Sequence, residues 1–200
     1  MGDPEQTETT TAAEPAYAYK PSLAGAPWHF RLAPDHIAWT KGYRTGTLPY
    51  RDITRIRLSF RPMTMQTKRF LTEIWAPGTP KLSITSASWK GLIEQTALVG
   101  PYSEFITELH RRVAASGAQP RCESGIHPVL YWIGVVVYAA VLFGLAALIV
   151  RALQIASYPA ALFVAAFFGV FAWQLGHFFR LNKPARYQPD APPADLLPRD

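Results

Sequence analysis

The chain contains a single cysteine, Cys122, so the sequence excludes an internal disulfide framework and any zinc or iron–sulfur site built from several cysteines. Its five histidines form neither an HExxH motif nor an i,i+4 pair. The GxSxG and GxxxxGK[ST] sequences of hydrolases and nucleotide-binding proteins are absent. These absences predict a protein that is not an enzyme, with no catalytic residue, no cofactor and no metal.

Charge is almost absent from the C-terminal part, where residues 128–179 hold one charged side chain, Arg151. The apolar runs 128–150 and 155–179 are each long enough, at about 1.5 Å per helical residue, to cross a hydrocarbon core of about 30 Å. We therefore predict transmembrane helices at 128–150 and 155–179. The short connection between them makes a hairpin, whose two ends face the same compartment.

The basic residues around this hairpin predict its orientation. The connection offers only Arg151, whereas Arg121 precedes the first helix and Arg180, Lys183 and Arg186 follow the second. Since basic residues stay on the cytoplasmic side, both termini are expected in the cytoplasm. The predicted location is the inner (plasma) membrane, as a multi-pass protein.

Both ends of the chain have the composition of disordered tails. Residues 1–26 are rich in Thr, Ala and Pro, carry four acidic residues and one lysine, and show no apolar periodicity. Residues 181–200 contain five prolines. We predict disordered segments over 1–26 and 181–200. Leu196 and Leu197 would be the anchors if the second segment were a docking motif, although solvated Pro-rich tails are commoner.

Between these regions, residues 27–117 have the pattern of a small α+β domain. The clearest strand is 54–61, where Ile56, Leu58 and Phe60 share one face and the intervening positions are polar. Further strands are expected at 28–32, 36–40, 68–75 and 81–86. An amphipathic helix then follows, with one apolar stripe made of Tyr102, Phe105, Ile106, Leu109 and Val113.

Three segments of this domain match a known pattern: His36–Trp39, Leu48–Ile53 and Tyr102–Ile106. With them the chain resembles the bacterial pleckstrin-homology-like (PH-like) domains that are joined to transmembrane helices. The resemblance implies a small antiparallel β-barrel or sandwich with a C-terminal capping helix, and no enzymatic activity. The lipid-binding motif of the eukaryotic relatives has no residue-by-residue match here, so the resemblance transfers no lipid-binding residue.

The predicted domain is strongly basic, since residues 27–117 carry 13 basic and 6 acidic side chains, a net charge of +7. A basic residue close to an anionic membrane surface contributes about 1 kcal/mol of binding. The candidate lipid-binding residues are Arg55, Arg57, Arg61, Lys68 and Arg69. The alternative is a solvated strand face whose charges prevent edge aggregation. Nucleic-acid binding is not expected, because no recognition helix or RNA-binding motif is present.

Small and polar residues of the apolar runs suggest contacts of other kinds. Ala140 and Gly144 lie four residues apart, as do Ala165 and Gly169, so each helix offers a groove for close approach. The grooves would serve packing of the two helices on each other, or a homodimer or a membrane protein partner. His127, Gln174 and His177 near the helix ends are read as interfacial anchors. Cys122 is either an inert thiol or an S-acylation site.

The sequence thus predicts a non-enzymatic integral membrane protein with a cytosolic PH-like module. The module would bind the lipid bilayer through anionic headgroups, or act as a scaffold. The alternative is an accessory subunit of a larger membrane protein complex, in which the module and the hairpin bind protein partners.

Overall fold

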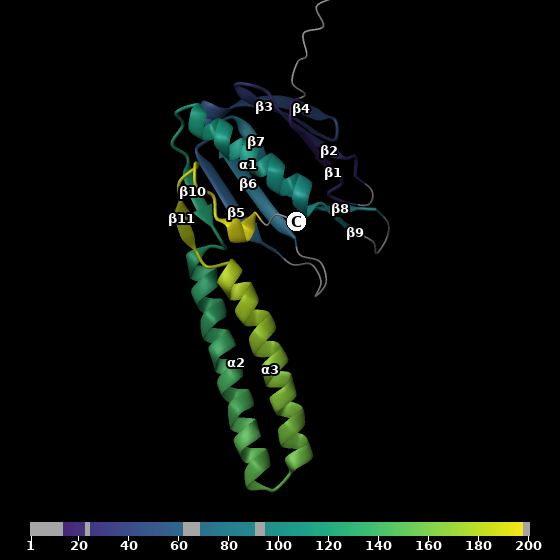
Figure 1. Cartoon of the computed structure of the whole chain (residues 1–200), viewed down its shortest axis with the longest axis vertical. Helices are drawn as coiled ribbons and strands as arrows, with labels where there is room; N and C mark the ends of the chain where they lie inside the picture. Colours follow the sequence, from purple (N-terminus) through teal and green to yellow (C-terminus); the bar gives the residue numbers. More distant parts are fainter. Residues whose placement is uncertain (1–13, 23–24, 62–68, 91–94, 198–200) are drawn as a thin grey trace, which may run out of the picture.

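The computed structural model describes residues 14–22, 25–61, 69–90 and 95–197, and shows a β-rich domain at one end of a long helical hairpin (Figure 1). The first sheet is antiparallel, with its strands in chain order: β1 (Ala16–Tyr19), β2 (Trp28–Leu32), β3 (His36–Lys41) and β4 (Arg44–Pro49). A short 3-10 helix, η1 (Tyr50–Asp52), leads to the second sheet. The fold class is α+β, as predicted.

The second sheet has the strand order β11-β10-β5-β6-β7 and draws on both ends of the domain sequence. Its strands are β5 (Arg55–Phe60), β6 (Phe70–Ala76), β7 (Thr79–Thr85), β10 (Arg121–Ser124) and β11 (Ala185–Tyr187). Because β10 runs parallel to β5, this sheet is mixed rather than wholly antiparallel. The strands β8 (Ala87–Trp89) and β9 (Gln95–Ala97) form a separate pair before helix α1 (Val99–Ala115).

The prediction of disorder over 1–26 and 181–200 is wrong for the parts of these segments that pair or pack with the domain. Within 1–26, β1 pairs with β2 and buries the rings of Tyr17 and Tyr19. Within 181–200, β11 pairs with β10, and Leu196 and Leu197 are 3% and 6% exposed in the core, beside the 3-10 helix η2 (Ala194–Leu196). Both strands are too short for a periodicity to be recognised in the sequence, and β11 also pairs with residues more than 60 positions earlier in the chain.

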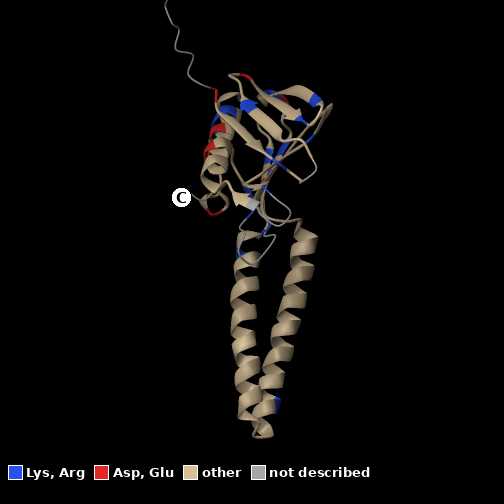
Figure 2. Ribbon diagram, turned by 90° about the vertical axis from the view of Figure 1, so that its right-hand side faces the viewer, with Lys and Arg blue, Asp and Glu red and all other residues tan. Residues whose placement is uncertain are grey.

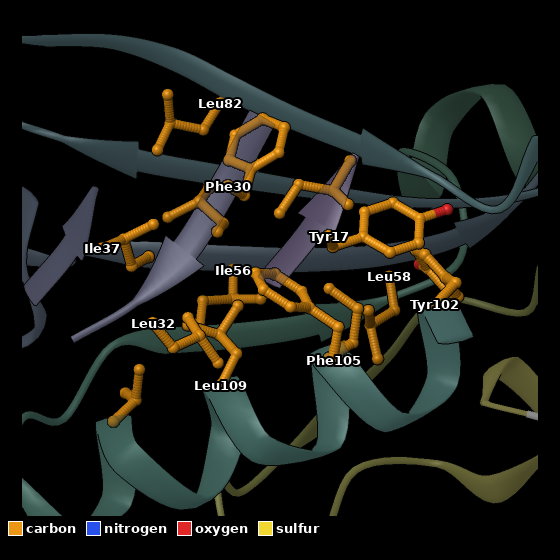
Figure 3. Packing of buried hydrophobic residues seen from close by; sticks show 14 of the residues in the cluster. Tyr17, Phe30, Leu32, Ile37, Ile56, Leu58, Leu82, Tyr102, Phe105 and Leu109 are labelled. Carbon is orange, nitrogen blue, oxygen red and sulfur yellow. The ribbon is translucent and has the colours of Figure 1, made fainter. Parts of the chain in front are cut away.

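The predicted strand and helix faces pack into one core. Ile56 and Leu58 of β5 are fully buried, and they lie against the apolar stripe of α1 (Figure 3). All five stripe residues of α1 are at most 3% exposed. Tyr102 also places its hydroxyl 2.6 Å from that of Thr72, so its one polar atom is hydrogen-bonded inside the core.

Strand β1 closes the open edge of the second sheet with its side chains. The hydroxyls of Tyr17 and Tyr19 donate to the carbonyl oxygens of Thr85 and Ser83 on β7. An unpaired strand edge would otherwise expose these acceptors to pairing with another chain. The segment predicted as a disordered tail therefore completes the domain.

The hairpin consists of α2 (Pro128–Gln154) and α3 (Tyr158–Leu181), both long and apolar enough to cross a membrane. The helices predicted at 128–150 and 155–179 are thus present, with shifted ends. The first continues to Gln154 because Arg151 to Gln154 are good helix formers. The reversal occurs at Ala156, with a left-handed φ of 57°, and Pro159 opens the second helix. Figure 2 shows charge in the domain and hardly any along the hairpin.

Candidate functional site

The hairpin is inserted between two neighbouring strands of the second sheet. Strand β10 ends at Ser124 and α2 begins at Pro128, while α3 ends at Leu181 and β11 begins at Ala185. Ser124 and Ala185 face each other in the β10–β11 pair, so both connections leave the sheet at one point. The domain is therefore held at the membrane end by two short tethers.

Asn182 ties the hairpin to the neighbouring strand at this point. It is fully buried, its Oδ1 accepts a hydrogen bond of 3.2 Å from the backbone N–H of Phe60, and its backbone oxygen accepts one from Ile126. Gly125, at a φ of +78°, passes so close that a Cβ there would overlap the backbone oxygen of Asn182. The end of β5 is thus fixed directly against the last turn of α3.

The candidate lipid-binding residues divide into two groups along β5. Arg61 follows Phe60 at the hairpin end, is exposed, and its N–H donates to the Arg69 carbonyl at 2.8 Å. Arg55 lies at the opposite end of the strand, about 20 Å away at roughly 3.3 Å per residue. Lys68 falls outside the described residues.

Arg55 and Arg57 share a carboxylate that sequence reasoning did not identify. Both donate to Oε2 of Glu123 on β10, at 2.5 and 2.7 Å. Burial raises the pKa of Glu123, but the hydrogen bonds from Arg57 and Arg55 outweigh it and hold that pKa below its usual value. Glu123 is 66 residues away from Arg57, and only the parallel pairing of β10 with β5 reveals it.

This ion cluster extends across the outer face of the sheet in register. Arg186, Glu123, Arg57 and Glu73 stand opposite one another on successive strands, which alternates the charges. Lys81 then pairs with Glu73 at 2.7 Å. Such cross-strand pairs stabilise a sheet, and they leave the Arg57 side chain only 14% exposed. This end of β5 is thus an ion-paired face in the interior of the sheet, rather than the solvated strand face at an edge that the sequence analysis gave as the alternative.

The hairpin end of the domain has a different charge balance. The sequence has no Asp or Glu over 53–72 or over 124–189, the two segments that meet there. Four of the described basic residues are close in sequence to the point where the domain joins the hairpin: Arg61, Arg69, Arg180 and Lys183. Asp195 belongs to η2, which contacts β5 and lies beside the domain end of α3 (Figure 1), and Asp190 precedes it in the chain. The part of the domain next to the apolar hairpin is therefore enriched in cations.

No family model, curated protein or solved structure matches this chain.

The two helices pack through aromatic and small residues other than those predicted. The Tyr138 hydroxyl donates to the Ala172 carbonyl at 2.8 Å, and its ring lies 5.2 Å from that of Phe179. Gly134 provides the space for Phe179. At Gly144 and Gly169, by contrast, an added Cβ would have no neighbour within 4 Å, so the prediction that they serve hairpin packing is wrong.

The remaining reactive side chains are buried or engaged in structural contacts. Cys122 is 2% exposed and burial raises its pKa to about 11, which describes an inert thiol. The His177 ring lies 6.1 Å from the ring of Phe60 in an edge-on contact. Among the described residues, no group of three His, Cys, Asp or Glu side chains could hold a metal ion. The chemistry that this arrangement does offer is electrostatic attraction and hydrogen-bond donation at one end of the domain.

Proposed function

We propose that this chain is a non-enzymatic integral membrane protein whose PH-like module binds the anionic surface of the membrane that its own hairpin crosses. Strands β1 to β9 precede the packed helix α1, the order that the PH-like resemblance implies, whereas β10 and β11 join the second sheet after that helix. The observation that carries the proposal is the cation-enriched domain end, fixed to the hairpin by the buried Asn182.

The distance of each basic residue from the membrane decides whether it contributes to binding of the anionic surface. The Debye length is about 8 Å at physiological ionic strength, so only cations close to the hairpin gain from lipid charge. Arg61, Arg69 and Lys183 meet this condition among the described residues. Arg55 and Arg57 belong to the Glu123 ion cluster and contribute little. At about 1 kcal/mol per residue near the surface, the group would supply several kcal/mol.

Basic flanks also support a cytoplasmic module. Arg180 lies in the last turn of α3, and Lys183 and Arg186 follow that helix, whereas Arg151 is the single basic residue near the hairpin turn. By the positive-inside rule both termini lie in the cytoplasm, where the anionic lipid is. The proposed location is the inner membrane.

Thermal unfolding of the full chain in lipid nanodiscs tests the proposal. Phosphatidylglycerol that binds the folded domain should raise its Tm relative to phosphatidylcholine alone, and salt should remove the difference. A gain of about 2 kcal/mol corresponds to roughly 4–8 °C at this chain length. Arg61→Glu combined with Lys183→Glu should abolish the gain.

Arg44→Glu combined with Arg51→Glu is the matched control, because both side chains are exposed and belong to the first sheet and η1, away from the hairpin in sequence. This variant should keep the lipid-dependent gain. An equal Tm in neutral and anionic nanodiscs at low salt would refute surface binding.

A second candidate function is that of an accessory subunit in a membrane protein complex. The exposed small residues Ala140, Gly144, Ala165 and Gly169 favour it, because they lie outside the contact between α2 and α3. Gly144→Leu combined with Gly169→Leu would then shift the oligomeric mass in mild detergent. A chain that is monomeric with and without these changes, alone and in its native membrane extract, would exclude this function.

A further inference from the structure

We propose that the face of α3 next to β5 binds one anionic phospholipid, with the phosphate held by Gln174, His177 and Arg180. The inference rests on the proposed function and specifies a ligand for the same end of the domain. It concerns a defined site for a single lipid molecule, in addition to general attraction to a charged surface.

The three polar side chains lie on one side of the last turns of α3. Each is three residues from the next, so His177 neighbours both Gln174 and Arg180 on the helix surface, while Gln174 and Arg180 are about 120° apart around the helix axis. Arg180 is exposed, and its Nη2 lies 3.3 Å from Nδ1 of His177. Polar residues at this depth of an apolar helix carry functional interest because placing them near hydrocarbon is costly.

The contact between Arg180 and His177 determines which histidine nitrogen is a donor. A guanidinium group can only donate, so Nδ1 of His177 accepts and its ring proton resides on Nε2. The pair therefore presents an imidazole N–H together with the remaining guanidinium N–H groups. Donors of this kind match phosphate oxygens, which only accept, and a charged guanidinium strengthens each bond.

The strand end holds this donor group in place. The His177 ring packs edge-on against Phe60 at 6.1 Å, and Phe60 is itself fixed to Asn182 at the end of α3. Arg61 follows Phe60 directly, and Lys183 follows Asn182. The donor group thus lies within a region of positive charge, and it is pre-organised before any ligand arrives.

An exposed apolar stripe continues the same helix face toward the hairpin turn. The stripe consists of Val170, Phe167 and Phe163. Going back along the chain from Gln174, these residues come at spacings of four, three and four, which keeps them on one face with Gln174. They are 55%, 53% and 75% exposed, so α2 does not cover them.

The length and polarity of this stripe select a lipid rather than free phosphate. From Phe163 to His177 the helix rises about 21 Å, roughly the thickness of one leaflet with its headgroup. Donors at one end and apolar side chains along the rest match the two parts of a phospholipid. A soluble phosphate would use only the donors.

Native mass spectrometry of the full chain tests the site. The protein is released from nanodiscs of phosphatidylcholine with one fifth phosphatidylglycerol, and the phosphatidylglycerol molecules retained per chain are counted. We expect one to be retained, and its retention to fall about tenfold in Arg180→Gln and in His177→Phe. The phenylalanine keeps an aromatic ring against Phe60 and removes both the Nε2 donor and the Nδ1 atom that accepts from Arg180. Arg151→Gln, an exposed arginine at the other end of the hairpin, is the control that should change nothing.

Two results would overturn the inference. One is equal retention by the wild-type chain and both variants. The other is displacement of the lipid by millimolar inorganic phosphate in detergent, which would make the ligand a soluble anion. Unchanged retention together with a lipid-dependent Tm would reject this site but leave surface binding intact. Loss of the Tm gain with retention intact would reject surface binding alone.

Discussion

Gly125 is the residue on which the connection between domain and hairpin depends most directly. Its φ of +78° belongs to the left-handed region, and a Cβ there would overlap the backbone oxygens of Asn182 and Lys183. Gly125→Ala should therefore destabilise the domain by more than about 3 kcal/mol, because backbone cannot move aside as a side chain can. The measurement is the Tm of the full chain in nanodiscs.

Gly78 provides the matched control for that substitution. It has a similar φ of +68° in the turn between β6 and β7, but nothing lies within 4 Å of the position that a Cβ would take. Gly78→Ala should cost only the conformational strain, about 1–2 kcal/mol. Equal losses in the two variants would show that the contact at Asn182 is not a constraint.

His110 makes the stability of the domain sensitive to acid. It is 1% exposed, its Nδ1 donates to the Ile106 carbonyl at 2.7 Å, and the Tyr187 hydroxyl donates to its Nε2 at 3.0 Å. Burial lowers the pKa of His110 to about 4, while an unfolded histidine titrates near 6.5. Stability should be complete above about pH 6.5 and fall by about 3 kcal/mol as the pH drops to about 4.

Tm values of the full chain at pH 7.5 and 4.5 measure this loss, and His110→Phe should remove most of it. The pKa of Glu108 is held at about 2 by hydrogen bonds from Arg111 and Arg112 against its burial. Its stabilising effect is lost only below about pH 4.5, so the two titrations separate. A variant with the wild-type pH slope would assign the acid sensitivity to another group.

At the scale of elements, the hairpin is an insertion that the sheet does not need for its topology. Strands β10 and β11 are antiparallel neighbours, and Ser124 already stands opposite Ala185. Replacing residues 125–184 by Asn-Gly would close them with a two-residue turn of the type that suits such a register. We expect a water-soluble, monomeric domain with the native strand content.

Circular dichroism and gel filtration of this shortened chain provide the measurement. Its Tm should be somewhat lower than that of the full chain, because the Phe60 N–H loses its Asn182 acceptor. A chain that lacks β11 as well, ending at Ser124, is the comparison and should be less stable, since it also loses Tyr187 and the buried Leu196 and Leu197. An aggregated or unfolded product from the Asn-Gly chain would mean that the hairpin is required for folding.

The elements that could be predicted are those whose signal lies within their own sequence. Apolar residues recur at every second position in β5 and about every 3.6 positions in α1, and the helices of the hairpin are long runs with almost no charge. β1, β10 and β11 are only three or four residues long, and β10 and β11 also pair with residues more than 60 positions away in the chain. Glu123 was missed for the same reason: its role as counter-ion to Arg55 and Arg57 exists only after the parallel pairing forms.

At the scale of the whole molecule, two tethers restrict the domain more than one would. The tethers are the short segments 125–127 and 182–184, and the backbone of Ile126 is hydrogen-bonded to that of Asn182. A single flexible linker would allow the domain to turn any face to the membrane. Here the end of β5 and the start of β6 lie at the hairpin (Figure 1), and Arg61 and Arg69 are the residues directly after and directly before these two strands.

The orientation of the whole chain across the membrane can be decided by thiol labelling. Tyr43 is fully exposed in the turn between β3 and β4, and Ile155 is 60% exposed at the hairpin turn. Three cations lie at or just after the end of α3 and one lies near the turn, so Ile155→Cys should react with a membrane-impermeant maleimide in intact cells. Tyr43→Cys should react only after the cells are opened.

The wild-type chain provides the internal control, because Cys122 is buried with its pKa raised to about 11 and should stay unlabelled in both preparations. The reverse pattern would place the domain outside the cell, where the inner-leaflet charge on which surface binding depends is missing, and it would therefore refute the orientation and the proposed function together.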